Sequence, residues 1–162
     1  GGDDFDEAID RYVKREHNVL LGDGVAEDIK IRIGTVSKKP GKQGEEIVRG
    51  RDLATGMPAT VMITPQDTAK ALAEPLNMLL ACLKKVLEKT PPELAADIIE
   101  RGIILTGGGA LLNGIVEAVQ DDTGITTTVA ESPLDCVALG TGKALANLTM
   151  LNASSGVENY KF

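Results

Sequence analysis

Three consecutive glycines interrupt the apolar run IILTGGGALLNG, which starts at Ile103. A turn that leaves a buried strand and opens a helix exposes backbone N–H groups at the positive end of that helix, where anions and polar ligand edges bind. Glycine costs backbone entropy in any element, so a triple needs a reason, and close approach of a ligand to the main chain supplies one. The pattern therefore favours a ligand contact at Gly107, Gly108 and Gly109 over a turn that serves packing alone.

A dinucleotide site is one candidate for this turn. Its fingerprint is G-x-G-x-x-G after a strand, with an acidic residue further on. Gly107 and Gly109 supply the first two glycines and Glu131 the acid, but Leu112 occupies the third glycine position. The stretch GTGKA, from Gly140, lacks the earlier glycine and the following hydroxyl residue of a P-loop. A dinucleotide site stays open as an alternative, and a P-loop does not.

Patterns for metal binding and covalent catalysis are missing from the sequence. One histidine, His17, and two distant cysteines, Cys82 and Cys136, are too few for a zinc site. No G-x-S-x-G motif supplies a nucleophile. The acidic residues among the first seven positions offset a helix dipole more simply than they hold a metal. We therefore expect no catalytic residue, no metal site, and two reduced, buried thiols.

Glu27 and Lys30 form a second charged feature, inside the stretch GDGVAEDIKIRIG. This stretch predicts a short helix that stops at Gly34. Residues three apart lie on one helix face, so the simplest expectation from spacing alone is an exposed ion pair.

The elements that position these residues begin with helices and a hairpin. DDFDEAIDRYVKREHN predicts a helix whose apolar stripe is Phe5, Ala8, Ile9, Tyr12 and Val13. A polar surface loop is expected over 35–46, followed by strands in IVRGRD and ATVMIT that are joined by a turn. Thr64, Pro65 and Asp67 predict a helix start, and the helix should run to about Glu88 with a bend at Pro75.

The second part of the chain alternates helices with strands. A helix from the Thr90–Glu93 stretch should end at Gly102, ahead of a strand over 103–105 and a helix from Leu111 to about Val119. DDTG predicts a turn and ITTTVA a strand, and Ser132 with Pro133 predicts a helix that contains Cys136 and is interrupted at Gly140 and Gly142. Alternation of this kind implies an α/β fold with parallel strands.

Composition narrows the class of protein. Of 162 residues, 43% are apolar and 25% charged, which is the balance of a folded domain. The net charge of −7 argues against a nucleic-acid surface, which needs a basic stripe. The longest apolar run, Met78–Leu83, is far shorter than the roughly 20 residues of a membrane span.

Several stretches together resemble the MreB family, the bacterial actins that determine rod shape. They are GGDDFDEAIDRYVKREHNVLLGDGVAEDIKIRIG, VRGRDLATGMP, EKTPPELAADIIERGIILTGGGALLNG and ESPLDCVALGTGKAL. The resemblance covers nearly the whole chain except the loop at 35–46 and the tail from about Met150. It implies the second half of the actin-like ATPase fold, a ribonuclease H-like α/β fold with a small inserted α+β subdomain.

The same resemblance implies subdomains and a ligand. The large subdomain would comprise 1–22 and 91–149, the small one 23–90, and the tail 150–162. ATP is the implied ligand, with its adenosine end against Glu27, Lys30 and the turn from Gly107 to Ala110. The phosphate loops, the catalytic Glu and most contacts to Mg²⁺ would precede Gly1, so we expect no ATP hydrolysis by this chain alone.

The implied partners follow from the family. It forms head-to-tail filaments through its second-half subdomains, organises cell-wall synthesis with membrane proteins of the elongation machinery, and lies in the cytoplasm at the inner face of the cell membrane. Membrane contact would depend on segments upstream of this chain. Another actin-like ATPase, or a dinucleotide-binding enzyme domain with the same glycine turn, is the alternative.

Overall fold

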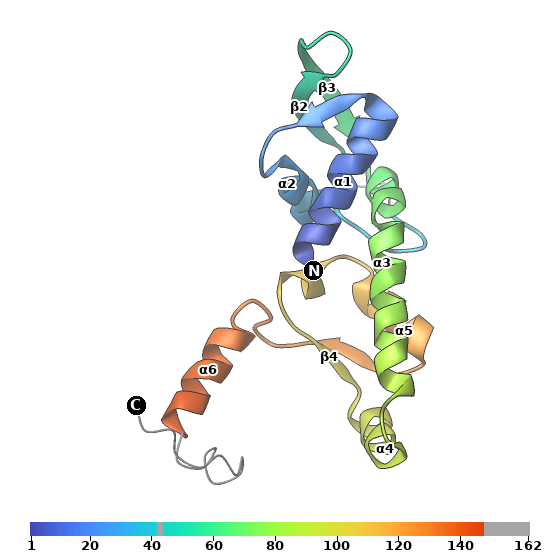
Figure 1. The fold of residues 1–162 in the computed structure, drawn as a ribbon, viewed down its shortest axis with the longest axis vertical. Coiled ribbons are helices and arrows are strands. Elements are labelled where there is room, and N and C mark those ends of the chain that lie inside the picture. Colours follow the sequence, from blue (N-terminus) through green and yellow to red (C-terminus); the bar gives the residue numbers. More distant parts are fainter. Residues whose placement is uncertain (42–43, 148–162) are drawn as a thin grey trace.

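The computed structural model describes residues 1–41 and 44–147 (Figure 1). The chain forms helices and strands in the following order: α1 (Gly2–His17), β1 (Val19–Leu21), α2 (Val25–Ile33), β2 (Glu46–Asp52), β3 (Pro58–Ile63), α3 (Pro65–Glu88), α4 (Pro92–Arg101), β4 (Ile103–Leu105), the 3-10 turn η1 (Gly108–Leu111), α5 (Ile115–Thr123), β5 (Thr127–Val129) and α6 (Cys136–Ala146). None of the helices described is both long and apolar enough to cross a bilayer.

The first helix follows its apolar stripe closely. The side chains that the helical period predicts to be internal are all buried: Phe5, Ala8, Ile9, Tyr12 and Val13. Asp3 and Asp4 occupy the first turn, and basic side chains occupy the last, so charges at both ends oppose the helix dipole. The helix ends at His17 as expected, where Asn18 adopts a left-handed conformation.

The larger sheet is antiparallel, with strand order β1-β2-β3. The predicted hairpin forms, with Val48 opposite Val61. The carboxylate of Asp52 accepts 2.8 Å hydrogen bonds from the backbone N–H groups of Ala54 and Thr55 and thereby closes its turn. Strand β1 is an additional strand that the sequence analysis did not predict, and it pairs with β2 from Val19 onward.

A capping box starts the longest helix, α3. The side chain of Thr64 accepts from the backbone of Asp67, and the Asp67 carboxylate accepts from the backbone N–H of Thr64 over 3.0 Å. The Tyr12 hydroxyl donates to the same carboxylate over 2.8 Å and so joins α1 to α3. Burial and the negative charge of Asp67 raise the pKa of Tyr12 to about 12. Burial acts to raise the pKa of Asp67, but the hydrogen bonds from Thr64 and Tyr12 prevail and lower it.

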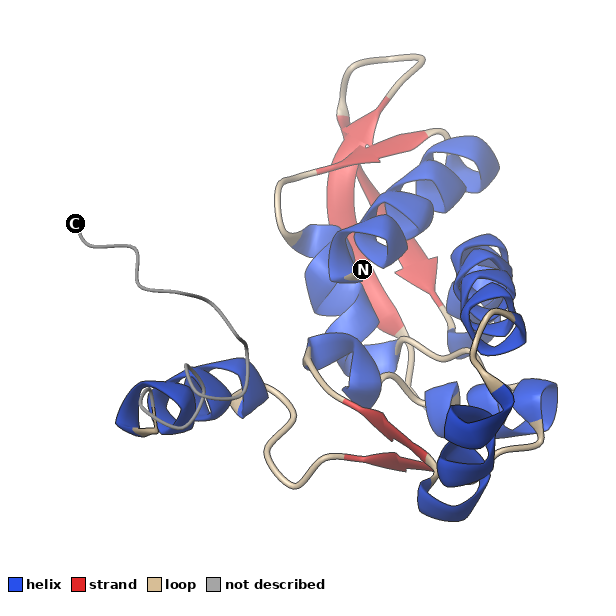
Figure 2. Cartoon of the chain, turned by 60° about the horizontal axis from the view of Figure 1, so that its bottom comes forward, coloured by secondary structure: helices blue, strands red, loops and turns tan. Residues whose placement is uncertain are grey.

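The second sheet holds the only parallel strand pair among the named strands in the described part. Strands β4 and β5 pair in parallel from Ile103 opposite Thr127, and α5 packs on them (Figures 1 and 2). The predicted parallel pairing is therefore confirmed here, whereas the larger sheet is antiparallel. Helix α6 stands apart in both views and has no buried residue.

Several local expectations were wrong. Residues 121–123 of the DDTG stretch end α5 rather than form the turn, because Gly124 caps the helix. Helix α6 begins at Cys136 and runs through Gly140 and Gly142 without interruption. Of the loop expected on the surface at 35–46, Thr35 and Val36 are buried.

The expectations for the two thiols and the tail have different outcomes. Cys82 and Cys136 are not bonded to each other. They are not buried, because Cys82 is exposed and Cys136 half-buried. The tail at 150–162 lies outside the described residues.

Candidate functional site

The glycine triple does not open an α-helix directly. Gly107 has a φ of 81° and donates its N–H to the carbonyl of Pro133 over 2.7 Å. The chain then makes the short 3-10 turn η1, and the next α-helix starts only at Ile115, four residues later than predicted. Ala110 is buried under the turn.

The three glycines differ in what the fold requires of them. Gly107 needs glycine because L-residues avoid a positive φ. At Gly109 a Cβ would meet no atom within 4 Å, and at Gly108 it would make an ordinary 3.5 Å contact with Leu134. Within the described chain, the N–H groups of Gly108 and Gly109 donate to no carbonyl. The turn thus presents bare backbone and two available donors, although folding alone requires only one of its glycines.

Glu27 and Lys30 both lie on α2, but they do not pair. Glu27 is exposed, and no ion pair of this side chain exists among the residues described. Lys30 Nζ instead lies 2.8 Å from Asp6 Oδ1, on α1. The expected Glu27–Lys30 pair was wrong because an acidic partner from a different helix reaches the ammonium group.

Asp10 lies one turn beyond Asp6 on α1. Burial and the carboxylates of Asp23 and Asp6 raise the pKa of Asp10.

A hydrogen-bonded clamp connects α2 to the glycine turn. Thr35, just past the end of α2, pairs in parallel with Asn113, just past η1. The Thr35 hydroxyl donates to Asn113 Oδ1 over 2.8 Å, and the N–H of Val36 donates to the Asn113 carbonyl over 2.9 Å. Figures 1 and 2 both show the turn after β4 on the side of the parallel pair that faces α1 and α2. The clamp was missed in the sequence, because nothing local marks two residues so far apart as partners.

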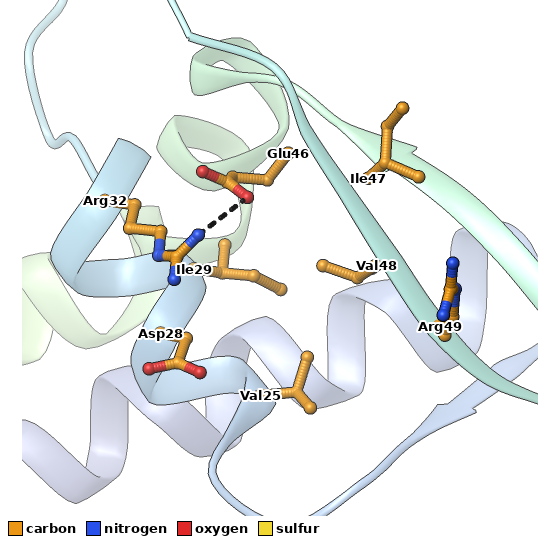
Figure 3. A pocket seen from close by; sticks show the side chains of 8 residues that line it. All are labelled: Val25, Asp28, Ile29, Arg32, Glu46, Ile47, Val48 and Arg49. Atoms are coloured by element: carbon orange, nitrogen blue, oxygen red, sulfur yellow. Dashed lines mark ion pairs between the residues drawn. The ribbon is translucent and has the colours of Figure 1, made fainter.

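The other face of α2 carries a groove with different chemistry. It has a volume of about 600 Å³ and lies between α2 and β2. Figure 3 shows Arg32 pointing toward Glu46. Arg32 Nη1 lies 3.5 Å from Glu46 Oε2. Neither Glu27, Lys30 nor the glycine turn lines this groove. The groove is therefore separate from the predicted site.

Comparison with known proteins identifies the family. The model of the family described as "MreB/Mbl protein" matches residues 1–153. The chain belongs to the MreB/Mbl family.

Curated MreB/Mbl relatives are similar along most of the chain. The cell shape-determining protein Mbl of Bacillus subtilis is 48% identical over 151 residues, which is 93% of this chain and 45% of the relative. The cell shape-determining protein MreB of Escherichia coli K12 is 49% identical, over 93% of this chain and 43% of the relative. The chain thus spans less than half the length of these relatives. The match also includes the loop at 35–46, which the resemblance in sequence motifs does not cover.

Solved structures agree with the MreB/Mbl assignment. The crystal structure of MreB 5 of Spiroplasma citri bound to AMPPNP has a TM-score of 0.87 and 32% identity, and covers 97% of this chain and 46% of that one. A MamK mutant bound to AMPPNP, at 18% identity and a TM-score of 0.64, supports the fold alone. The predicted fold class is confirmed: the chain has part of an actin-like α/β fold.

Proposed function

We propose that this chain forms the second half of an ATP-binding, filament-forming bacterial actin that maintains rod shape and organises cell-wall synthesis. The observation that carries the proposal is the match to MreB 5 along 97% of the chain, since that structure is described as bound to AMPPNP and a second one as bound to ADP. No feature of the glycine turn favours the dinucleotide alternative, because Leu112 is buried in the core where that fingerprint needs a glycine.

The adenosine end of the nucleotide would lie on the wall made by α2 and the glycine turn. Glu27 is exposed and can accept from ribose hydroxyls or the adenine amine, and Lys30 can lie along the base or ribose. Bare backbone at Gly108 and Gly109 lets the nucleoside approach closely, and the buried Ala110 anchors the turn in the fold. The phosphates and Mg²⁺ would be held mainly by the other half of the protein.

Self-association is the second part of the proposal. The hairpin of β2 and β3 and the helix α4 lie at opposite ends of the described structure (Figure 1). α4 has no buried residue and exposes Leu94 and Ile99. Contacts between unlike surfaces at opposite ends of a molecule generate open filaments. We assign the hairpin to the small subdomain, 23–90, and α4 to the large subdomain, 1–22 with 91–149, as the two sides of a head-to-tail contact.

The cellular setting belongs to the same proposal. The protein would work in the cytoplasm at the inner face of the membrane, with membrane proteins of the cell-wall elongation machinery as partners. Segments outside this chain would make the membrane contact, and no role with nucleic acid is proposed.

The decisive experiment is calorimetric titration of ATP into the full-length protein. Glu27→Ala combined with Lys30→Ala should lower ATP affinity at least about 100-fold, since each charged hydrogen bond contributes about 1.5–3 kcal/mol. Asp28→Ala combined with Arg32→Ala is the matched control, because it makes the same charge changes on the groove side of α2. Unchanged ATP affinity in the first variant would refute the site, and tighter binding of NAD than ATP would favour an enzyme.

A further inference from the structure

The ammonium group of Lys30 is held at the beginning of α1. Its Nζ lies 2.8 Å from Asp6 Oδ1, donates to Asp6 Oδ2 over 3.0 Å, and donates to the carbonyl of Gly2 over 3.4 Å. The Lys30 side chain is 14% exposed and that of Asp6 is 23% exposed. This arrangement differs from an ordinary surface ion pair, in which both side chains move freely in water.

The Lys30 ammonium group lies near the first turn of α1, and this location requires an acidic partner. The first turn of a helix carries partial positive charge, so an ammonium group placed there is repelled unless an anion accompanies it. Asp6 supplies that anion from within α1 itself, and the Gly2 carbonyl accepts a further hydrogen bond. A lysine side chain also has high rotamer entropy, and the two fixed acceptors restrict its conformations. Asp6 thus determines where the charge of Lys30 can lie.

We propose that Asp6 is a positioning residue for nucleoside binding, and that it acts by holding the Lys30 ammonium group in place for the ligand. The inference rests on the proposed function, in which Lys30 contacts the adenosine end of ATP. Asp6 itself need not touch the nucleotide. Without its carboxylate, the long flexible stem of Lys30 turns away from the positive end of α1, and binding has to order it again.

The test is a double-mutant cycle on the full-length protein, with ATP affinity measured by calorimetry and folding by thermal unfolding. Asp6→Asn should lower ATP affinity about tenfold. Lys30→Met should lower it at least as much, and the double variant should bind no more weakly than Lys30→Met alone. Asp3→Asn is the matched control, since Asp3 is an exposed carboxylate in the first turn of the same helix and should leave affinity unchanged.

The outcomes distinguish the positioning role of Asp6 from the nucleotide contact of Lys30. Unchanged or tighter ATP binding in Asp6→Asn, while Lys30→Met binds weakly, overturns the positioning role and leaves the nucleotide site intact. Additive losses in the double variant also overturn it, because Asp6 would then act through the fold of α1 rather than through Lys30. Unchanged binding in Lys30→Met removes the nucleotide contact and the positioning role with it. If Asp6→Asn does not fold, Asp6→Ser takes its place in the same cycle with the same expectations.

Discussion

Thr35 donates its side-chain hydroxyl to Asn113 Oδ1 over 2.8 Å, although the two residues are 78 positions apart in the chain. Thr35 is only 4% exposed, whereas Asn113 is exposed, so the hydrogen bond lies at the edge of the core. It joins the end of α2 to the end of the glycine turn, the two elements for which we propose nucleotide binding. We therefore expect the clamp to affect stability and, under the proposed function, ATP affinity.

Removing the clamp should destabilise the protein. We expect Thr35→Val to lower the free energy of unfolding by about 0.5–1.5 kcal/mol, because the part-buried hydrogen bond to Asn113 is lost and the N–H of Ser37 loses its acceptor. Calorimetric unfolding of the full-length protein measures the change. Thr60→Val is the control, since Thr60 is exposed on β3 and the same substitution there should change stability by less than about 0.5 kcal/mol. Equal effects in the two variants would contradict the clamp.

Two glycine substitutions should separate folding from binding. Gly109→Ala should leave the unfolding temperature nearly unchanged, because its Cβ would enter open space, but should weaken ATP binding by occupying the approach to the backbone. Gly107→Ala should lower stability by about 1–2 kcal/mol, because its φ of 81° is strained for alanine. Full ATP affinity in Gly109→Ala would show that the nucleoside does not approach the turn.

The bond from Tyr12 to Asp67 should give the protein a specific sensitivity to alkali. Because folding raises the pKa of Tyr12 from 10.0 to about 12, this group's contribution to stability is complete below pH 10 and is lost as the pH rises toward 12. The unfolding temperature should fall less steeply between pH 9.5 and about 12 in Tyr12→Phe than in the unchanged protein. Parallel curves for the two proteins would contradict the assignment.

The same bond acts in the opposite direction in acid. The pKa of Asp67 is lowered in the folded state, so its stabilising contribution is present above the ordinary value of 3.8 and is lost as the pH falls below it. Asp67→Asn should be less stable than the unchanged protein at pH 7, and the difference should shrink on acidification to about pH 2. Asp3→Asn, an exposed change of the same charge, serves as the control.

Head-to-tail assembly should depend on α4. Ile99 is 71% exposed, and Ile99→Asp should reduce ATP-dependent sedimentation of the full-length protein without lowering ATP affinity. Met78→Asp is the control, since Met78 is 68% exposed in the middle of α3 and belongs to neither the hairpin nor α4. Normal sedimentation of Ile99→Asp would remove α4 from the proposed contact.

Local features of the chain could be predicted from its sequence. The buried stripe of α1 follows the helical period, and the Thr64–Asp67 capping box lies within four residues. The position of the glycine turn could also be predicted, because its glycines follow β4 directly in the sequence. Family membership followed from motifs, and the family comparison confirms it.

Features that depend on distant partners could not be predicted. Strand β1 has only three residues and is stabilised by pairing with β2, so its own sequence gives little signal. Lys30 pairs with Asp6 on another helix instead of with Glu27 beside it. The start of α5 was predicted four residues early. Gly114 caps the helix, and its backbone packs so closely on Ser37 that only glycine fits, a contact that the local sequence does not reveal.

The hydrophobic core connects α2 with the residues that follow the glycine turn. Leu112 and Ile115, which follow the glycine turn, belong to the same buried cluster as Ile29 and Ile33 of α2. The spacing between α2 and the turn is therefore set by close-packed side chains, which do not deform continuously. Under the proposed function, a nucleoside would meet a preorganised surface, because folding rather than binding would bear the entropy cost of arranging its two sides.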